Sequence, residues 1–359
     1  MQKTTFLIVL NVWFLTASLR GQTLNAYEKK AEEAFQNHNY AAALEHNLVL
    51  LEVDSNRLDA LFQAGQSAKH LRAFPLAEKF LSKIPDSLKT GDYTAVDFDL
   101  GLVNKGLGRY DRAIHFFRKY IAAHRGELAL TELAKLEIES CEWAMEMVQN
   151  SSSARAKRLS DEVNSQNSEF APVRFAERLY FTSYDRADTS DNPLSRIFSS
   201  VKGYEITSWE KTSADSGLHS SNLVLTVDAR RMYFTICKST EQVYEYECEI
   251  WYRDRNYEGT WAKPKRLPNF INLDSVSTTM PSIGWDRFLE KEVLYFASDR
   301  PGGKGGMDIW FSIIEPDGKF GKPVCLPFNT PQDDVTPYFH QATQTLFFSS
   351  AGMENFGGF

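Results

Sequence analysis

The residues able to do chemistry in this sequence are few and widely spaced. The seven histidines show no metal-ligand spacing: His38, His46, His70, His115, His124, His219 and His340. No phosphate-binding loop, metalloprotease helix or Gly-x-Ser-x-Gly nucleophile elbow occurs, and the stretch Gly65 to Lys69 lacks the second glycine of that elbow. We therefore expect no catalytic residue, no metal site and no cofactor in this chain.

The cysteine count limits the number of disulfides, and the net charge argues against nucleic acid as a partner. Four cysteines are too few for a disulfide scaffold, but they allow one or two bridges in an oxidising compartment. Acidic residues outnumber basic ones, 47 to 40, so the formal net charge is −7. This composition offers no basic excess of the kind that holds a phosphate backbone. Nucleic acid is not an expected partner.

The first 21 residues predict export. Lys3 supplies a positive charge, and residues 6–19 form a nearly continuous apolar run. This run is shorter than the roughly 20 residues that span a bilayer, which is typical of a secretory signal peptide. We expect cleavage after Gly21. No later apolar run has spanning length, so we expect no transmembrane segment in the mature chain.

Residues 22–150 predict amphipathic helices with an internal repeat. Small and aromatic residues recur after 34 and then 36 positions. The three copies are Ala31, Ala34, Tyr40 and Ala43, then Gly65, Ala68, Phe74 and Ala77, then Gly101, Asn104, Tyr110 and Ala113. Small residues let paired helices approach closely. The segment resembles the tetratricopeptide repeat family, which implies an α-helical solenoid closed by a capping helix over residues 127–149.

In the register of that family, the first helix of each pair lines a concave groove. Phe62 and Phe98 occupy equivalent groove positions in consecutive repeats, and so do Lys69 and Lys105. The resemblance implies that these four residues contact a protein partner that carries an apolar anchor and an acidic group. The alternative is that the phenylalanines belong to the core and the lysines form a solvated edge.

A polar, serine-rich stretch over residues 151–167 predicts a linker, beyond which the apolar period changes to two. Four similar strands follow: Leu179 to Ser183, Met232 to Thr235, Leu294 to Ser298 and Leu346 to Ser350. Three of them precede a second hydrophobic strand, at Ile197-Phe198, Ile250-Trp251 and Ile309-Trp310. Four-stranded units repeated in this way are typical of a β-propeller.

The third unit resembles the TolB-type propeller repeat. It has a Ser-Asp-Arg turn over residues 298–300, a glycine-rich loop over residues 302–306 and an Asp-Ile-Trp return strand from Asp308. Residues 168–359 would then form about three and a half blades of an incomplete ring. The same motif is interrupted at Phe359, so we expect the sequence to be a fragment of a longer protein.

Alignment of the units places Cys237 and Cys248 on the second and third strands of the second unit, on either side of its hairpin loop. Antiparallel neighbours that flank a loop bring their Cα atoms within the distance that a disulfide needs. We expect a disulfide between Cys237 and Cys248, with Cys141 and Cys325 unpaired. The alternative is two separately buried thiols.

The order of signal peptide, tetratricopeptide repeats and TolB-like propeller is similar to a family of Gram-negative envelope proteins that end in an OmpA-like domain, some of which serve type IX secretion. The resemblance implies a non-catalytic periplasmic scaffold, associated with the outer membrane, that binds protein partners. It implies peptidoglycan binding only through a C-terminal domain absent from this chain. The alternative is an exported prolyl-oligopeptidase-like hydrolase whose catalytic domain lies beyond Phe359.

Overall fold

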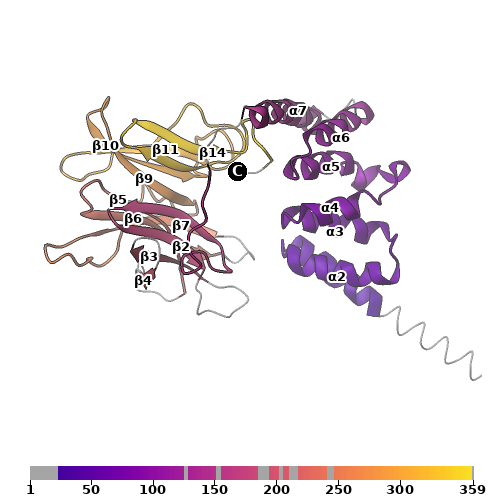
Figure 1. Cartoon of the computed structure of the whole chain (residues 1–359), viewed down its shortest axis with the longest axis horizontal. Helices are drawn as coiled ribbons and strands as arrows, with labels where there is room; N and C mark the ends of the chain where they lie inside the picture. The colour runs from indigo at the N-terminus through magenta and orange to yellow at the C-terminus, as the bar shows by residue number, and fades with distance from the viewer. Residues whose placement is uncertain are drawn as a thin grey trace, which may run out of the picture. The chain divides into compact units, whose positions relative to one another are not determined.

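The computed structural model describes residues 23–124, 128–150, 155–184, 194–201, 205–209, 217–240 and 246–357. The chain forms two compact units (Figure 1): the helical unit is Met1–Ser151 together with Glu354–Phe359, and the sheet unit is Ser152–Met353. The predicted signal peptide, residues 1–21, lies outside the described residues. Among the helices that are described, none combines the length and apolar character needed to cross a bilayer.

The described part of the helical unit contains seven helices. They are residues 23–36, α2 (Tyr40–Val53), α3 (Leu58–His70), α4 (Phe74–Leu81), α5 (Val96–Gly106), α6 (Tyr110–Ala123) and α7 (Leu128–Gln149). Two short 3-10 turns, Asp86–Leu88 and Gly91–Tyr93, separate α4 from α5. The side chain of Asn39 caps the N-terminus of α2 by accepting a hydrogen bond from the Ala42 N–H (3.2 Å), a backbone donor that has no partner within the helix.

Small residues bring consecutive helices into close contact, as the sequence pattern predicts. A Cβ added at Gly101 on α5 would lie 2.4 Å from the ring of Phe117 on α6. A Cβ added at Gly65 on α3 would lie 2.6 Å from Leu81 on α4. Phe117 and Leu81 are fully buried. These two junctions are therefore packed so tightly that they leave no room for an extra methyl group.

The sheet unit consists of consecutive antiparallel strands grouped into four sheets (Figure 1). The first sheet holds β1 (Glu169–Phe175), β2 (Arg178–Tyr184), β3 (Ser195–Val201) and β4 (Glu205–Trp209). The second holds β5 (His219–Leu225), β6 (Arg231–Ser239), β7 (Tyr246–Asp254) and β8 (Lys265–Arg266). The third holds β9 (Thr278–Asp286), β10 (Lys291–Ser298), β11 (Asp308–Ile314) and β12 (Val324–Cys325), and the last pairs β13 (Asp334–His340) with β14 (Thr345–Ser350).

The core of the sheet unit lies between sheets that are consecutive in the chain. Three clusters of buried apolar side chains each join one sheet to the next: Ile197 with Phe234, Ile250 with Phe296, and Val293 with Phe339. Each sheet therefore gives part of its apolar surface to the following one, and the burial of that surface holds the sheets together.

Cys237 on β6 and Cys248 on β7 face each other in the antiparallel ladder and form a disulfide, with their Cα atoms 4.1 Å apart. This confirms the predicted bridge. Cys141 and Cys325 are free, as expected. The bridge lies on the strand ends that flank the loop of this hairpin, so it ties the two central strands of the second sheet together.

The predicted fold class, a tetratricopeptide solenoid followed by an incomplete TolB-like propeller, is wrong. The described residues form seven helices and then four small antiparallel sheets, with no repeat solenoid, closed barrel or propeller. The helices vary from 8 residues in α4 to 22 in α7. A ring would also need the last sheet to pack on the first, whereas the apolar clusters of the described residues join successive sheets. The class is mixed α+β.

Candidate peptide-docking site

The two phenylalanines predicted to line a groove take part in packing within the helical unit. Phe98 on α5 is 5% exposed, and its ring centroid lies 5.5 Å from that of Phe117 and 5.7 Å from that of Tyr120. Phe62 on α3 is partly buried and meets the ring of Tyr93 edge-on at 5.1 Å. These are the offset and edge-to-face contacts that stabilise aromatic cores.

The two lysines predicted to line the same groove both have carboxylate partners. Lys69 Nζ on α3 lies 2.5 Å from Asp99 Oδ1 on α5. Lys105 Nζ on α5 lies 2.5 Å from Glu137 Oε2 on α7, and the Lys105 residue is 2% exposed. Each ion pair joins one helix to the next but one along the chain. The lysines therefore link helices, and neither ammonium group is an open contact for an acidic partner.

The four predicted residues lie on two helices, Phe62 and Lys69 on α3 and Phe98 and Lys105 on α5, and each has its own packing or ion-pair partner elsewhere in the helical unit. Because Phe98 and Lys105 are buried, alanine at either position changes the stability of the helical unit as well as any contact with a partner. A loss of partner binding in a variant with alanine at all four positions could therefore result from a less stable helical unit, so its free energy of unfolding has to be measured as well.

A different set of side chains on the helical unit holds a short segment of the chain, residues 354–357. The Ser140 hydroxyl on α7 accepts a hydrogen bond from the Asn355 N–H (2.9 Å) and donates one to the Asn355 carbonyl oxygen (3.1 Å). The Tyr110 hydroxyl on α6 donates to the Phe356 carbonyl oxygen (3.4 Å). Lys105 Nζ also donates to Ser140 Oγ (2.8 Å), which orients the hydroxyl. Three backbone groups of the segment are thereby satisfied by two side chains.

The rest of the segment fits the same surface by shape. The ring of Phe356 packs on Trp143 of α7, with centroids 5.0 Å apart. Gly357 has φ +94°, and a Cβ there would lie 2.8 Å from the Lys105 carbonyl carbon. The Gly357 N–H closes a turn by donating to Asn355 Oδ1 (2.9 Å). We call Asn355 to Gly357 the docked turn, and the surface of α5, α6 and α7 that holds it the docking face.

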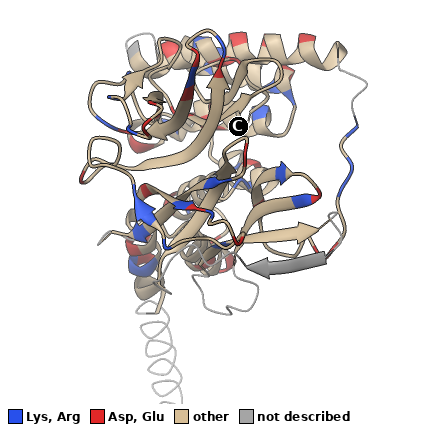
Figure 2. Ribbon diagram, turned by 90° about the vertical axis from the view of Figure 1, so that its left-hand side faces the viewer, with Lys and Arg blue, Asp and Glu red and all other residues tan. Residues whose placement is uncertain are grey.

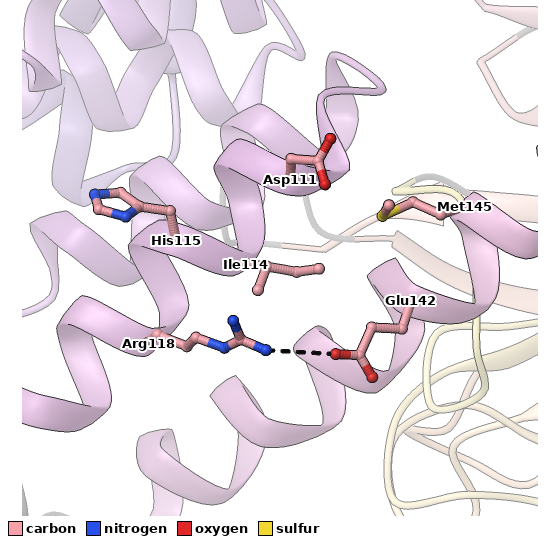
Figure 3. Close-up of a pocket in the computed structure, with 6 residues that line it drawn as sticks. All are labelled: Asp111, Ile114, His115, Arg118, Glu142 and Met145. Atoms are coloured by element: carbon pink, nitrogen blue, oxygen red, sulfur yellow. Dashed lines mark ion pairs between the residues drawn. The ribbon is translucent and has the colours of Figure 1, made fainter.

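A pocket of about 450 Å³ opens between α6 and α7 (Figure 3). Ile114 and Met145 contribute its apolar part, and an ion pair between Arg118 and Glu142 (3.6 Å) spans the two helices at one end. The remaining lining residues are Asp111 and His115. Asp111 is next to Tyr110 in sequence and Glu142 is next to Trp143, so the pocket lies on the same two helices as the docking face.

Helix α7 carries an excess of negatively charged residues. Helix α7, at the top of Figure 2, carries five glutamates and a single lysine. Three of these carboxylates are paired: Glu132 with Lys135, Glu137 with Lys105 and Glu142 with Arg118. Acidic residues therefore outnumber basic ones on α7, which favours a partner segment that adds no further negative charge beside this helix.

Sequence patterns did not identify Ser140 and Trp143, and they assigned Tyr110 only to the turn between two helices. One local signal exists, since Ser140 and Trp143 are three residues apart on α7 and so share a helix face. The segment that they hold lies 215 positions further along the chain from Ser140. Only the folded structure relates two sites so far apart in sequence.

Cys141, which neighbours Ser140, is expected to resist alkylation in the folded protein. Burial raises the pKa of its thiol to about 11. At pH 8 only about one molecule in a thousand then carries the reactive thiolate. Since the raised pKa lies above the ordinary value of 9.0, the stability that the thiol contributes is complete below pH 9 and falls as the pH rises toward 11.

Mass spectrometry after timed treatment with iodoacetamide checks this expectation. Cys325 is only half-buried and provides the internal comparison. Cys325 should be modified first at pH 8, and Cys141 only after the helical unit is unfolded with urea. Equal rates for the two thiols in the folded protein would contradict the burial of Cys141.

No family model matches the sequence, and no curated protein matches it. Among solved structures, the chain is similar to a puromycin-hydrolyzing peptidase from Mycobacterium tuberculosis, with a TM-score of 0.28 and 16% sequence identity. The match covers 47% of this chain and 25% of that chain, so it spans about a quarter of the peptidase. A likeness this low assigns neither a fold nor an activity to the present protein.

Proposed function

We propose that this protein is a non-catalytic scaffold of the Gram-negative periplasm, associated with the outer membrane, that binds other proteins through the docking face. The observation that carries the proposal is the seating of residues 354–357 on α5, α6 and α7 by the side chains of Tyr110, Ser140 and Trp143. A surface that satisfies the backbone of one segment has the chemistry to hold a partner's segment in the same way.

The contacts divide into a general and a selective part. Within the docked segment, Ser140 and Tyr110 bond to main-chain atoms, which any polypeptide offers. Trp143 adds an aromatic surface that favours an aromatic side chain at the position of Phe356. Main-chain hydrogen bonds with a single side-chain anchor are a recurring mode of peptide recognition, and they need no reactive group.

Two features support an exported location. The N-terminal residues have the charge and apolar length of a secretory signal. Cys237 and Cys248 are paired as a disulfide, a bond that persists in the periplasm and is rare in the cytosol. The partners that we propose are accordingly proteins of the envelope, including outer-membrane or secretion assemblies.

Site-specific photo-crosslinking in intact Gram-negative cells tests the proposal. A photoreactive phenylalanine analogue at Trp143 of the full chain should form discrete adducts with one or a few envelope proteins. The matched control places the same analogue at Val148, which lies on α7 and is 56% exposed but contributes nothing to the docking face. The same adducts from both positions, no adduct from position 143, or turnover of peptide or ester substrates by the purified chain would each overturn the scaffold proposal.

A further inference from the structure

We propose that the docking face selects a turn of the sequence Asn-aromatic-Gly, and that partner proteins present this turn in place of residues 355–357. The inference rests on the proposed function and names the chemistry of the partner. Each of the three positions of the docked turn has its own structural requirement, and the three requirements are independent.

The first position needs a short side chain with a carbonyl oxygen. Asn355 Oδ1 accepts the hydrogen bond from the Gly357 N–H (2.9 Å), which folds the segment into a turn. The turn presents the N–H and carbonyl oxygen of the same residue to one hydroxyl, Ser140 Oγ, at 2.9 and 3.1 Å. A longer side chain at this position cannot close a turn of this size. Aspartate could accept the same hydrogen bond, but it would add a negative charge beside α7, which carries five glutamates and one lysine.

The second position needs an aromatic ring. The Phe356 ring lies 5.0 Å from the Trp143 ring at an interplanar angle of 51°, within the range where aromatic pairs attract. Phe356 remains 49% exposed, so its outer edge is open to water. The position therefore selects for a flat apolar surface without enclosing it, and tyrosine or tryptophan would fit as phenylalanine does.

The third position admits only glycine. Gly357 has φ +94°, a conformation that residues with a Cβ rarely adopt. The added Cβ would also lie 2.8 Å from the Lys105 carbonyl carbon and 2.9 Å from the Gly106 nitrogen, both backbone atoms at the end of α5. Backbone atoms cannot move aside as a flexible side chain can. The positive φ and this steric clash therefore each exclude residues other than glycine.

The docked turn and a partner's turn cannot occupy the face together. A segment of the same chain acts at a high effective concentration, so it reduces the apparent affinity of a partner by the fraction of time that the face is free. A change that expels the docked turn should therefore increase partner affinity. This competition makes the selectivity measurable with the intact chain.

The test uses a fluorescent copy of residues 353–359, Met-Glu-Asn-Phe-Gly-Gly-Phe, and full-length protein. Gly357→Ala should empty the face, and hydrogen exchange at Asn355 should confirm this by becoming faster. We expect the peptide to bind this variant at least tenfold more tightly than it binds the wild type. Gly318→Ala is the matched control, since Gly318 has φ +80° and nothing lies within 4 Å of its added Cβ. It should bind the peptide as the wild type does.

Further arms test the signature and the site. A peptide with alanine in place of its first glycine should lose at least tenfold in affinity for Gly357→Ala protein. Adding Ser140→Ala to that variant should also weaken peptide binding at least tenfold. The matched control adds Ser67→Ala instead, because Ser67 is a buried serine on α3 whose hydroxyl has no hydrogen-bond partner. This control should leave peptide binding unchanged. Unfolding curves of each variant show whether the fold is intact.

Three results would overturn the proposal. They are equal affinity for the glycine and alanine peptides, no binding to the Gly357→Ala variant, and a wild-type dimer lost in that variant, which would make a second copy the occupant. Discrete adducts at Trp143 in cells together with any of these results would leave the scaffold standing and remove the Asn-aromatic-Gly signature. Selective peptide binding without adducts in cells would leave the Asn-aromatic-Gly signature standing and remove the scaffold proposal.

Discussion

Replacing Lys105 with methionine is expected to lower the free energy of unfolding of the helical unit by about 3–5 kcal/mol. The substitution keeps the aliphatic part of the side chain but removes the charge that lies 2.5 Å from Glu137 Oε2. The Glu137 side chain is only 16% exposed, so its carboxylate would remain unpaired with little water around it. Urea unfolding followed by circular dichroism, with hydrogen exchange of α5 and α7 to locate the change, measures the effect.

Two further variants separate the buried charge from other causes. Lys135 on α7 pairs with Glu132 but is 52% exposed, so Lys135→Met should change stability by less than about 1 kcal/mol. Lys105→Met combined with Glu137→Leu removes both charges and should recover most of the loss. If Lys105→Met costs no more than Lys135→Met, Lys105 is not held as a buried ion pair and becomes available again as a contact for a partner.

Serine at both Cys237 and Cys248 is expected to lower the free energy of unfolding of the sheet unit by about 2–3 kcal/mol. The bridge joins residues 11 positions apart, and a cross-link around a loop of that size restricts the unfolded chain by about this amount. Urea unfolding followed by tryptophan fluorescence reports mainly on this unit, which contains Trp251, Trp261, Trp285 and Trp310, and replacing Trp143 on α7 by phenylalanine removes the tryptophan signal of the described helices.

Reduction of the wild-type protein should produce the same shift as the double serine variant and no shift in that variant. Cys325→Ser is the control for a cysteine of the same unit that takes part in no bridge, and it should leave the shift caused by reduction unchanged. A wild-type midpoint that a reductant leaves unchanged, with free thiols at both positions on peptide mapping, would contradict the bridge.

Local patterns in the sequence were enough to place several elements and one covalent bond. The alternating residues Leu294 to Ser298 lie within β10, and Leu179 to Ser183 lie within β2. The disulfide was predictable because its two cysteines flank one hairpin, where each strand's neighbour is set by the turn. Features of this kind depend on residues close together in the chain.

The larger architecture was not predictable in the same way. Repeated strand motifs predicted a propeller, but a repeat determines only which strands pair within a sheet. Ring closure depends on whether distant sheets share apolar surface, and the clusters of the described residues join each sheet to its neighbour in the chain. Helical repeats likewise predicted a regular solenoid, whereas the helices differ in length and two 3-10 turns separate α4 from α5.

The candidate site depends on contacts between residues that are far apart in the sequence. From the sequence, Lys105 had the spacing of an exposed groove residue, but Glu137, 32 positions away, makes it a buried ion pair. No sequence pattern identified Ser140, yet its hydroxyl forms two hydrogen bonds with Asn355, 215 positions further along the chain. Periodicity reports which face of a helix a residue occupies, whereas burial and binding depend on what the rest of the chain places against that face.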